Sequence, residues 1–242
     1  MAAACVSDEL GSSGKASMKA TLTCPEPLAV TLDARSSALV IVDMQNEYVR
    51  ETGKAYMPRS AGALQSILPL LTTFRAASAS VIFVQSVRRE NALQFTRFGR
   101  PLRLIEGSWG AELVEELSPL PGESLVQKRT HDCFYETAFE HTLSAAGLHP
   151  GEASVVVTGV ATHGCVDCAV TGLSIRDFQV FVPIDCTAGY SKRLELIGFE
   201  HFLGPGYDYN VKPTASNLIS FERGDADRSR SGANTFSRRI GV

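Results

Sequence analysis

The sequence predicts one α/β domain of the doubly wound type, a three-layer sandwich in which helices cover both faces of a mainly parallel sheet. Short apolar runs rich in Val and Ile alternate with segments whose apolar residues recur every three or four positions. The runs are apolar throughout, which is typical of strands buried on both faces. A chain of 242 residues that is 44% hydrophobic is long enough to bury one sizeable core.

The predicted elements follow one another along the chain. The first strand reads ALVIVD, and the helix after it has Leu64, Ile67 and Leu71 at helical spacing. Strands are predicted at 38–43, 80–85, 124–128, 154–159 and 179–185. Helices are predicted at 61–77, 110–117, 136–146, 165–177 and 194–203.

The flanking segments lack this patterning. Residues 1–28 are rich in Ala, Ser, Gly and Lys, which predicts a flexible leader, and 223–242 form a polar, basic tail. The folded domain is therefore expected to span 29–222. Within it, the long stretch 86–110 carries arginines among aromatic residues without a period, as functional loops often do.

Charge and composition exclude several classes of partner. A net charge of −3 and a pI near 6.0 give no reason to expect nucleic acid or an anionic membrane. The apolar run at 38–42 is far too short to cross a bilayer, and 1–20 lack the layout of a secretory signal. We therefore expect a cytoplasmic protein that acts on a small molecule.

The six cysteines do not suggest a disulfide framework in a chain of this length. Only Cys165 and Cys168 have a short, metal-like spacing, whereas a zinc site usually draws on paired short spacings. We expect no metal and no cofactor. The same C-x-x-C spacing also occurs in redox proteins, which leaves a redox function as an alternative.

Three ionisable residues follow three predicted strands. Asp43 ends the first strand, Lys128 ends the third, and Cys165 comes just after the fourth, where a helix begins. Since the carboxyl ends of parallel strands share one edge, where ligands bind, these side chains are expected to meet. A helix N-terminus would also favour the anionic form of Cys165.

This set of residues suits acyl transfer. The thiol of Cys165 would attack a carbonyl carbon, Asp43 would accept and return a proton, and Lys128 would steady the negative charge. His163 is an alternative base, which the residue pattern alone leaves open.

The sequence around these residues resembles the isochorismatase-like cysteine hydrolase superfamily, which includes nicotinamidases, N-carbamoylsarcosine amidases, and ureidoacrylate and biuret amidohydrolases. The resemblance lies in DMQNEY at 43–48, KR at 128–129 and GVATHGCV at 159–166, and it covers roughly 38–189. It implies a catalytic triad of Asp43, Lys128 and Cys165. It also implies a cis peptide between Val160 and Ala161, with an oxyanion hole formed by the N–H groups of Ala161 and Cys165.

Departures from the pattern narrow the function. The presence of Cys165 favours cleavage of a C–N bond over the vinyl ether chemistry of isochorismatases. The stretch 85–91, QSVRREN, lacks the histidines that follow this strand in metal-dependent nicotinamidases. The segments 106–113 and 128–134 look more like the ureido and carbamoyl branch.

We therefore predict an amidohydrolase that cleaves a small amide, ureido or carbamoyl compound through a thioester. The residues expected to contact the substrate are Gln45, Asn46, Tyr48, Arg88 or Arg89, Trp109, Phe134, Tyr135 and Val160. A catalytically silent scaffold and a nicotinamidase-type amidase are the alternatives. The resemblance further implies a homo-oligomer, a dimer or a tetramer.

Overall fold

A computed structural model describes residues 23–206 and 209–222. Most of the predicted leader, 1–28, and all of the predicted tail, 223–242, lie outside the described residues. Residues 23–28 approach the domain in extended form, and the N–H of Leu28 donates to the carbonyl of Pro213 at 2.9 Å.

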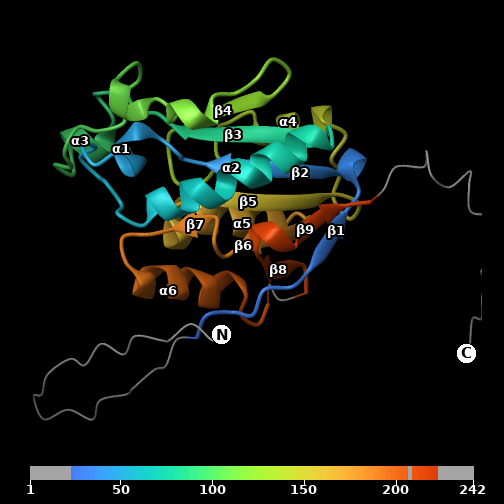
Figure 1. Cartoon of the computed structure of the whole chain (residues 1–242). Helices are drawn as coiled ribbons and strands as arrows, with labels where there is room; N and C mark the ends of the chain where they lie inside the picture. The colour runs from blue at the N-terminus through green and yellow to red at the C-terminus, as the bar shows by residue number, and fades with distance from the viewer. Residues whose placement is uncertain (1–22, 207–208, 223–242) are drawn as a thin grey trace, which may run out of the picture.

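The core of the molecule is a parallel sheet with the strand order β4-β3-β2-β5-β6-β8 (Figure 1). The short strand β7 pairs with the end of β5, beyond the last residue that β5 pairs with β6. The strands are β2 (Ser37–Val42), β3 (Ser80–Ser86), β4 (Ser124–Lys128), β5 (Ser154–Val160), β6 (Gln179–Pro183), β7 (Thr187–Ala188) and β8 (Val211–Thr214). This arrangement confirms the predicted fold class.

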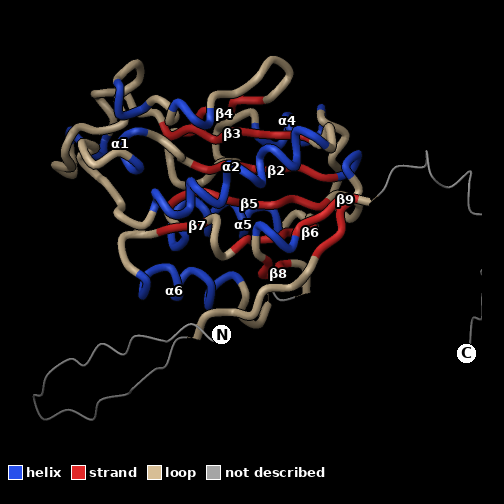
Figure 2. Tube along the Cα trace, viewed as in Figure 1, coloured by secondary structure: helices blue, strands red, loops and turns tan. Residues whose placement is uncertain are grey.

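Helices cover both faces of the sheet, as Figure 2 shows. Strand β2 explains how, because alternate side chains of a strand point to opposite faces. Leu39 and Ile41 pack with α2, whereas Val40 and Val42 pack with α4, α5 and α6. The helices are α1 (Asn46–Val49), α2 (Ser60–Ala76), α3 (Leu93–Thr96), α4 (Phe139–Ala145), α5 (Asp167–Ser174) and α6 (Lys192–Phe202).

A second, two-stranded sheet lies beside the first. It pairs β1 (Val30–Leu32) in parallel with β9 (Ile219–Phe221), near the two ends of the described chain. The carbonyl of Leu32 accepts a hydrogen bond from the N–H of Glu222 at 2.8 Å. Neither strand is among the predicted ones, and neither are β7 and β8.

All five predicted strands are present, and β4 has the predicted bounds. The helix predicted at 110–117 is wrong. Two 3₁₀ turns, Trp109–Ala111 and Glu115–Leu117, stand there instead. The residues between them are extended, because the carbonyl of Glu112 and the N–H of Val114 bond to the backbone that follows β2.

Two other predicted helices are shorter than expected. Helix α4 begins only at Phe139, since Glu136 has a φ of 53° and the hydroxyl of Thr137 accepts from the N–H of Phe139. The helix predicted from Cys165 begins as an irregular turn, Thr162–Val166, and becomes α5 at Asp167. Within the described ranges, no helix is long and apolar enough to span a bilayer.

Candidate active site

The carboxyl ends of the central strands bring Asp43, Lys128 and Cys165 together. The Nζ of Lys128 lies 2.9 Å from Asp43 Oδ2 and 3.0 Å from Cys165 Sγ. Lys128 and Asp43 are fully buried, and Cys165 keeps 6% of its surface exposed. The three side chains, which are far apart in sequence, therefore form one buried cluster.

The backbone that carries Asp43 is fixed by the neighbouring strands. Asp43 has a φ of 53°, and its N–H donates to the carbonyl of Val84 at 2.8 Å. Beside it, Gly159 has a φ of 110°, and a Cβ there would stand only 2.0 Å from the carbonyl oxygen of Val42. Glycine at this position therefore lets the ends of β2 and β5 approach closely.

Cys165 lies in the turn between β5 and α5. The peptide bond between Val160 and Ala161 is cis. Gly164 has a non-helical backbone, with φ of −138° and ψ of −107°, and the N–H of Val166 donates to the carbonyl of Ala161 at 3.2 Å. The turn places Cys165 in the core cluster that packs against α5.

Burial and charge both act on the ionisable groups of the cluster. Burial raises the pKa of Cys165, the charge of Asp43 raises it further, and Lys128 offsets these effects only in part. Burial by itself would lower the pKa of Lys128, but the charges of Asp43 and Cys165 outweigh it and raise that pKa. Burial thus opposes the effect on the thiol of Cys165 that was expected from a helix N-terminus.

The two oxygens of Asp43 have different surroundings. Oδ2 accepts hydrogen bonds from Lys128 and from the hydroxyl of Ser86, which lies 3.0 Å away. Oδ1 is buried and has no hydrogen-bond partner among the described residues. A buried carboxylate oxygen without a donor is costly unless a ligand supplies one, so Oδ1 is available to accept a proton.

Ser86 belongs to the cluster and is not among the predicted site residues. It ends β3 and is fully buried, and its hydroxyl accepts from Lys128 Nζ at 2.8 Å while donating to Asp43. It therefore fixes the ammonium and the carboxylate relative to each other. Its position at a strand end, like those of Asp43 and Lys128, was the available signal.

Tyr48 and Arg88, two of the predicted substrate-binding residues, lie beside the cluster. Burial raises the pKa of Tyr48, and the charges of Asp43 and Cys165 raise it further. The Nη1 of Arg88 donates to the carbonyls of Val87 and Lys128, at 3.2 and 3.3 Å. Arg88 is buried and has no ion pair among the described residues.

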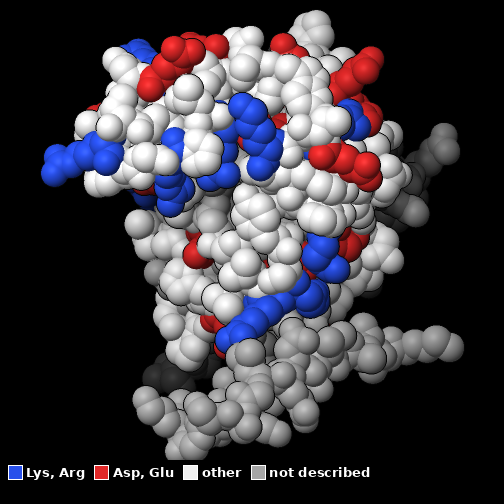
Figure 3. All heavy atoms as spheres, turned by 90° about the vertical axis from the view of Figure 1, so that its left-hand side faces the viewer, with Lys and Arg blue, Asp and Glu red and all other residues white. Residues whose placement is uncertain are grey.

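Burial lowers the pKa of Arg88, and the charge of Arg103 lowers it further. Burial lowers the pKa of His131, and the charges of Lys128, Arg88 and Arg100 lower it further. Figure 3, which looks onto the end of the sheet where α1 follows β2, shows Lys and Arg side chains gathering on part of this face. Positive charge is thus present at the end of the molecule where the cluster lies.

Gln45 and Asn46 form the frame of the site. The Nε2 of Gln45 donates to the carbonyls of Ser86 and Ala111, and its Oε1 accepts from the N–H of Ser86 at 3.0 Å. Asn46 donates to the carbonyl of Trp109 at 3.0 Å. The amide of Gln45 is thus occupied by the backbone that it ties together, and a substrate contact at Gln45 stays a prediction.

The other residues of the predicted site differ in their surroundings. Phe134 packs edge-on against Phe139, under the guanidinium of Arg176, so it belongs to the helical layer. A substrate contact at Phe134 stays a prediction, and the side chain packs against the core cluster that includes Cys165. Tyr135 is 56% exposed, and the Arg89 alternative to Arg88 is also at the surface. Val160 is buried in the cluster of side chains that contacts α2.

The remaining alternatives concern His163, Cys168 and a metal. His163 lies 6.3 Å, ring to ring, from Tyr190, and the charges that act on it are those of Asp167 and Glu195. Cys165, Cys168 and the other cysteines within 23–206 are free thiols. Among the described residues, no three His, Cys, Asp or Glu side chains gather as metal ligands.

Solved structures share this fold. An isochorismatase-like hydrolase from Alkaliphilus metalliredigens matches with a TM-score of 0.67 and 25% identity, over 75% of this chain and 96% of its own. N-carbamoylsarcosine amidase from Thermoplasma acidophilum matches at 0.64 and 22%, over 75% and 97%. Pyrazinamidase of Pyrococcus horikoshii, solved in complex with zinc, matches at 0.66 and 20%, over 74% and 99%.

The fold and the site together define a class: a parallel, doubly wound α/β protein with a thiol, an ammonium and a carboxylate buried at the carboxyl edge of its sheet. The profile of the Isochorismatase domain matches residues 37–205, which is more than half of the chain. The chain therefore belongs to the isochorismatase-like hydrolase family.

Proposed function

We propose that this protein is a cysteine-dependent amidohydrolase that cleaves a C–N bond of a small amide, ureido or carbamoyl compound. The observation that carries the proposal is the position of Lys128, whose Nζ is within hydrogen-bond distance of both Asp43 and Cys165. One ammonium can thereby stabilise negative charge on either partner as a proton moves between them.

In the proposed first half-reaction, Cys165 attacks the carbonyl carbon while its proton moves to Asp43. Concerted removal of the proton fits a thiol whose pKa is raised by burial. Asp43 Oδ1, which has no partner among the described residues, is the natural acceptor. The proton then passes to the leaving nitrogen as the C–N bond breaks, which leaves a thioester.

Water completes the proposed cycle. Asp43 removes a proton from the water, which attacks the thioester carbon, and the proton returns to Cys165 as the acid leaves. The N–H groups of Ala161 and Cys165, at the two ends of the turn after β5, are proposed to bind the oxyanion of both tetrahedral intermediates. Losing one such donor typically lowers the rate about a hundredfold or more.

The substrate proposed here is small and carries a carbonyl or carboxylate group beside the scissile bond. Arg88 is buried without an ion pair among the described residues, so an oxygen of the substrate would complete its hydrogen bonding. Tyr48, close to both Asp43 and Cys165, is proposed as a wall of the same site. The protein is further proposed to act in the cytoplasm, as a homo-oligomer.

A catalytically silent scaffold is the second candidate, favoured by the small exposed fraction of Cys165. A screen for ammonia release would separate the two. The purified protein is incubated with ureidoacrylate, biuret, N-carbamoyl amino acids, nicotinamide and simple amides. Turnover of at least one compound is expected, and its absence throughout, together with no covalent adduct by mass spectrometry, would favour the scaffold.

The nucleophile is tested with a matched pair of cysteine variants. Cys165→Ala should lower turnover by at least about a thousandfold and abolish the acyl adduct, because the attacking atom is gone. Cys168→Ala, which changes a half-buried thiol one helical turn away, should keep most of the activity. Equal loss in both variants would instead support the redox alternative, and substantial turnover by Cys165→Ala would refute the proposed mechanism.

A further inference from the structure

A cavity of about 240 Å³ lies beside α1. It is not lined by Asp43, Lys128 or Cys165. Its walls come from α1, from the turn after it and from the loop between β3 and β4. The lining residues are Glu47, Thr52, Lys54, Leu102, Arg103, Leu104, Ile105, Ser108, Trp109 and Gly110. This volume suits a metabolite smaller than a drug-sized ligand.

Glu47 is an unpartnered carboxyl group in the wall of this cavity. It is 4% exposed, and its Oε1 has no hydrogen-bond partner among the described residues. The carboxyl group rests against Gly110, where a Cβ would come within 2.5 Å of Oε2. Glycine thus leaves room for a buried acid that makes no ion pair within the described chain, which is costly unless a ligand supplies the partner.

Two cations stand on the same cavity wall, yet neither neutralises Glu47. Lys54 donates from Nζ to the carbonyl of Leu102 at 3.3 Å, and it shares the lining with Arg103. Both act on Glu47 through their charge, but burial prevails and its pKa is raised. The acidic side chain of Glu47 and the basic side chains of Lys54 and Arg103 therefore line the same cavity without forming an ion pair with one another.

The rest of the lining is mainly apolar. Leu102, Ile105 and the half-exposed indole of Trp109 offer surface to an aliphatic or aromatic group. A purely cationic ligand would meet Lys54 and Arg103, and a purely anionic one would meet Glu47, so each is disfavoured on one side of the cavity.

We propose that this cavity binds a small zwitterion, an α-amino acid with an apolar side chain. Its ammonium group would bind Glu47, its carboxylate would lie between Lys54 and Arg103, and its side chain would pack against Trp109 and Ile105. Each charged group of the ligand then has an opposite charge, as a buried ion requires. This assignment does not depend on the reaction proposed for Cys165.

The chain provides its own probe, because Trp109 is its single tryptophan. L-leucine titrated into the intact protein should change the fluorescence of Trp109 in a saturable manner. Isoamylamine, which lacks the carboxylate of leucine, and 4-methylpentanoate, which lacks the ammonium, should each bind at least about tenfold more weakly. No saturable change with leucine, or equal binding of either analogue, would overturn the proposal.

Substitutions locate the site. Glu47→Gln keeps the shape of the side chain and should weaken leucine binding by about tenfold or more, since the opposite charge is lost. Glu106→Gln removes an exposed acid of the neighbouring loop and should bind leucine like the parent protein. Should Glu47→Gln fail to fold, Lys54→Gln, at an exposed position, should still show weakened binding. Unchanged affinity in the folded variants would refute the assignment.

Discussion

The single residue that most controls the chemistry of the cluster is Asp43. Its negative charge raises the pKa of both neighbours. This keeps the thiol of Cys165 neutral and the amine of Lys128 charged. In the proposed mechanism, a general base that disfavours the free thiolate would keep Cys165 protonated until a substrate arrives. The site would then be activated only when a carbonyl carbon can accept the sulfur.

Asp43→Asn should therefore separate reactivity from turnover. Removing the negative charge leaves Lys128 as the dominant neighbour of Cys165, so the pKa of the thiol should fall. Alkylation of Cys165 by iodoacetamide at neutral pH should become faster, while hydrolysis should drop by about a hundredfold or more. Peptide mass spectrometry after timed alkylation measures the first, and ammonia release measures the second.

Ser86→Ala is the control for this prediction. It removes a hydrogen bond to Asp43 without changing the charge, so it should alter alkylation of Cys165 much less than Asp43→Asn does. Slower alkylation in Asp43→Asn would contradict the inference that the charge of Asp43 raises the pKa of Cys165.

At the residue scale, the sequence was sufficient to predict the cluster and only part of its surroundings. Asp43, Lys128 and Cys165 were predictable because a parallel sheet brings the ends of its strands to one edge. The contacts of Gln45 and Phe134 were not predictable, because their partners are backbone carbonyls and helix surfaces that only the folded chain brings near. Glu47 gave no signal in the sequence at all.

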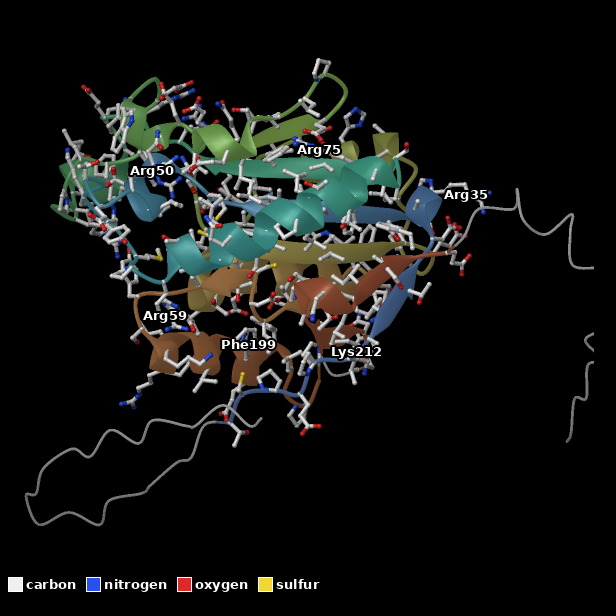
Figure 4. The ribbon with its side chains drawn as sticks, viewed as in Figure 1. Arg35, Arg50, Arg59, Arg75, Phe199 and Lys212 are labelled. Carbon is white, nitrogen blue, oxygen red and sulfur yellow. The ribbon has the colours of Figure 1, made fainter. Side chains whose placement is uncertain are left out.

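Among the elements, helix α2 is fastened to the sheet by an ion pair at its C-terminal end. Arg75 Nε and Nη2 donate to the two carboxylate oxygens of Glu123, at 2.7 and 2.8 Å, just before β4 begins. Arg75 also donates to the carbonyl of Ser118 at 3.1 Å. Figure 4 shows Arg75 between α2 and the strands at the β4 edge. The pair thus links the covering helix to the edge strand that carries Lys128.

Glu123→Gln should make stability less dependent on pH. Burial by itself would raise the pKa of Glu123, but hydrogen bonds from Arg75 and the N–H of Leu120 lower it overall. A lowered pKa contributes stability above the unfolded value of about 4.3, and that stability is lost as pH falls through the lower folded value. We expect the substitution to cost roughly 1 kcal/mol at neutral pH and almost nothing in acid.

Denaturant unfolding at a series of pH values measures this difference. Glu140→Gln is the matched control, because Glu140 is 73% exposed and lies 3.7 Å from its partner Arg176. It should change the free energy of unfolding by less than about 0.5 kcal/mol at any pH. If Glu123→Gln lowered the free energy of unfolding by the same amount at every pH, the loss would instead indicate a packing effect.

The long elements were predictable, and the short ones were not. Strands of five or more residues with apolar runs, and the helix at 60–76, have a clear period. Strands β1, β7 and β9 have two or three residues, and β8 contains Pro213, so a period cannot develop. The segment 110–117 has helix-forming residues, but its backbone bonds to the chain after β2, and tertiary contacts override the local preference.

At the scale of the whole molecule, the small sheet joins two segments separated by most of the chain. Leu32 of β1 is 2% exposed and packs in the cluster that contains α2, and Phe221 of β9 meets Phe74 of α2 edge-on, with ring centroids 4.9 Å apart. The two ends of the described chain are therefore held together, and packed against α2, by strands that the sequence pattern does not predict.

Leu32→Ala should lower the stability of the entire domain, not only of β1. Deleting a buried leucine side chain typically costs about 2–4 kcal/mol, because a cavity is added to the lost burial. Thr31→Ala, at the adjacent outward-facing position, should cost less than about 1 kcal/mol. Guanidinium unfolding followed by circular dichroism measures both, and equal losses would show that β1 acts through its backbone alone.

The pairing of β1 with β9 also determines how the domain would respond to mechanical force. Because the strands are parallel, a tether attached before β1 and another after β9 would pull the ladder from opposite ends. Its hydrogen bonds would then be loaded together in shear, whereas an antiparallel hairpin pulled at its two ends peels open one bond at a time. Stretched in this direction, the molecule is expected to yield abruptly and only at the higher force that shearing requires.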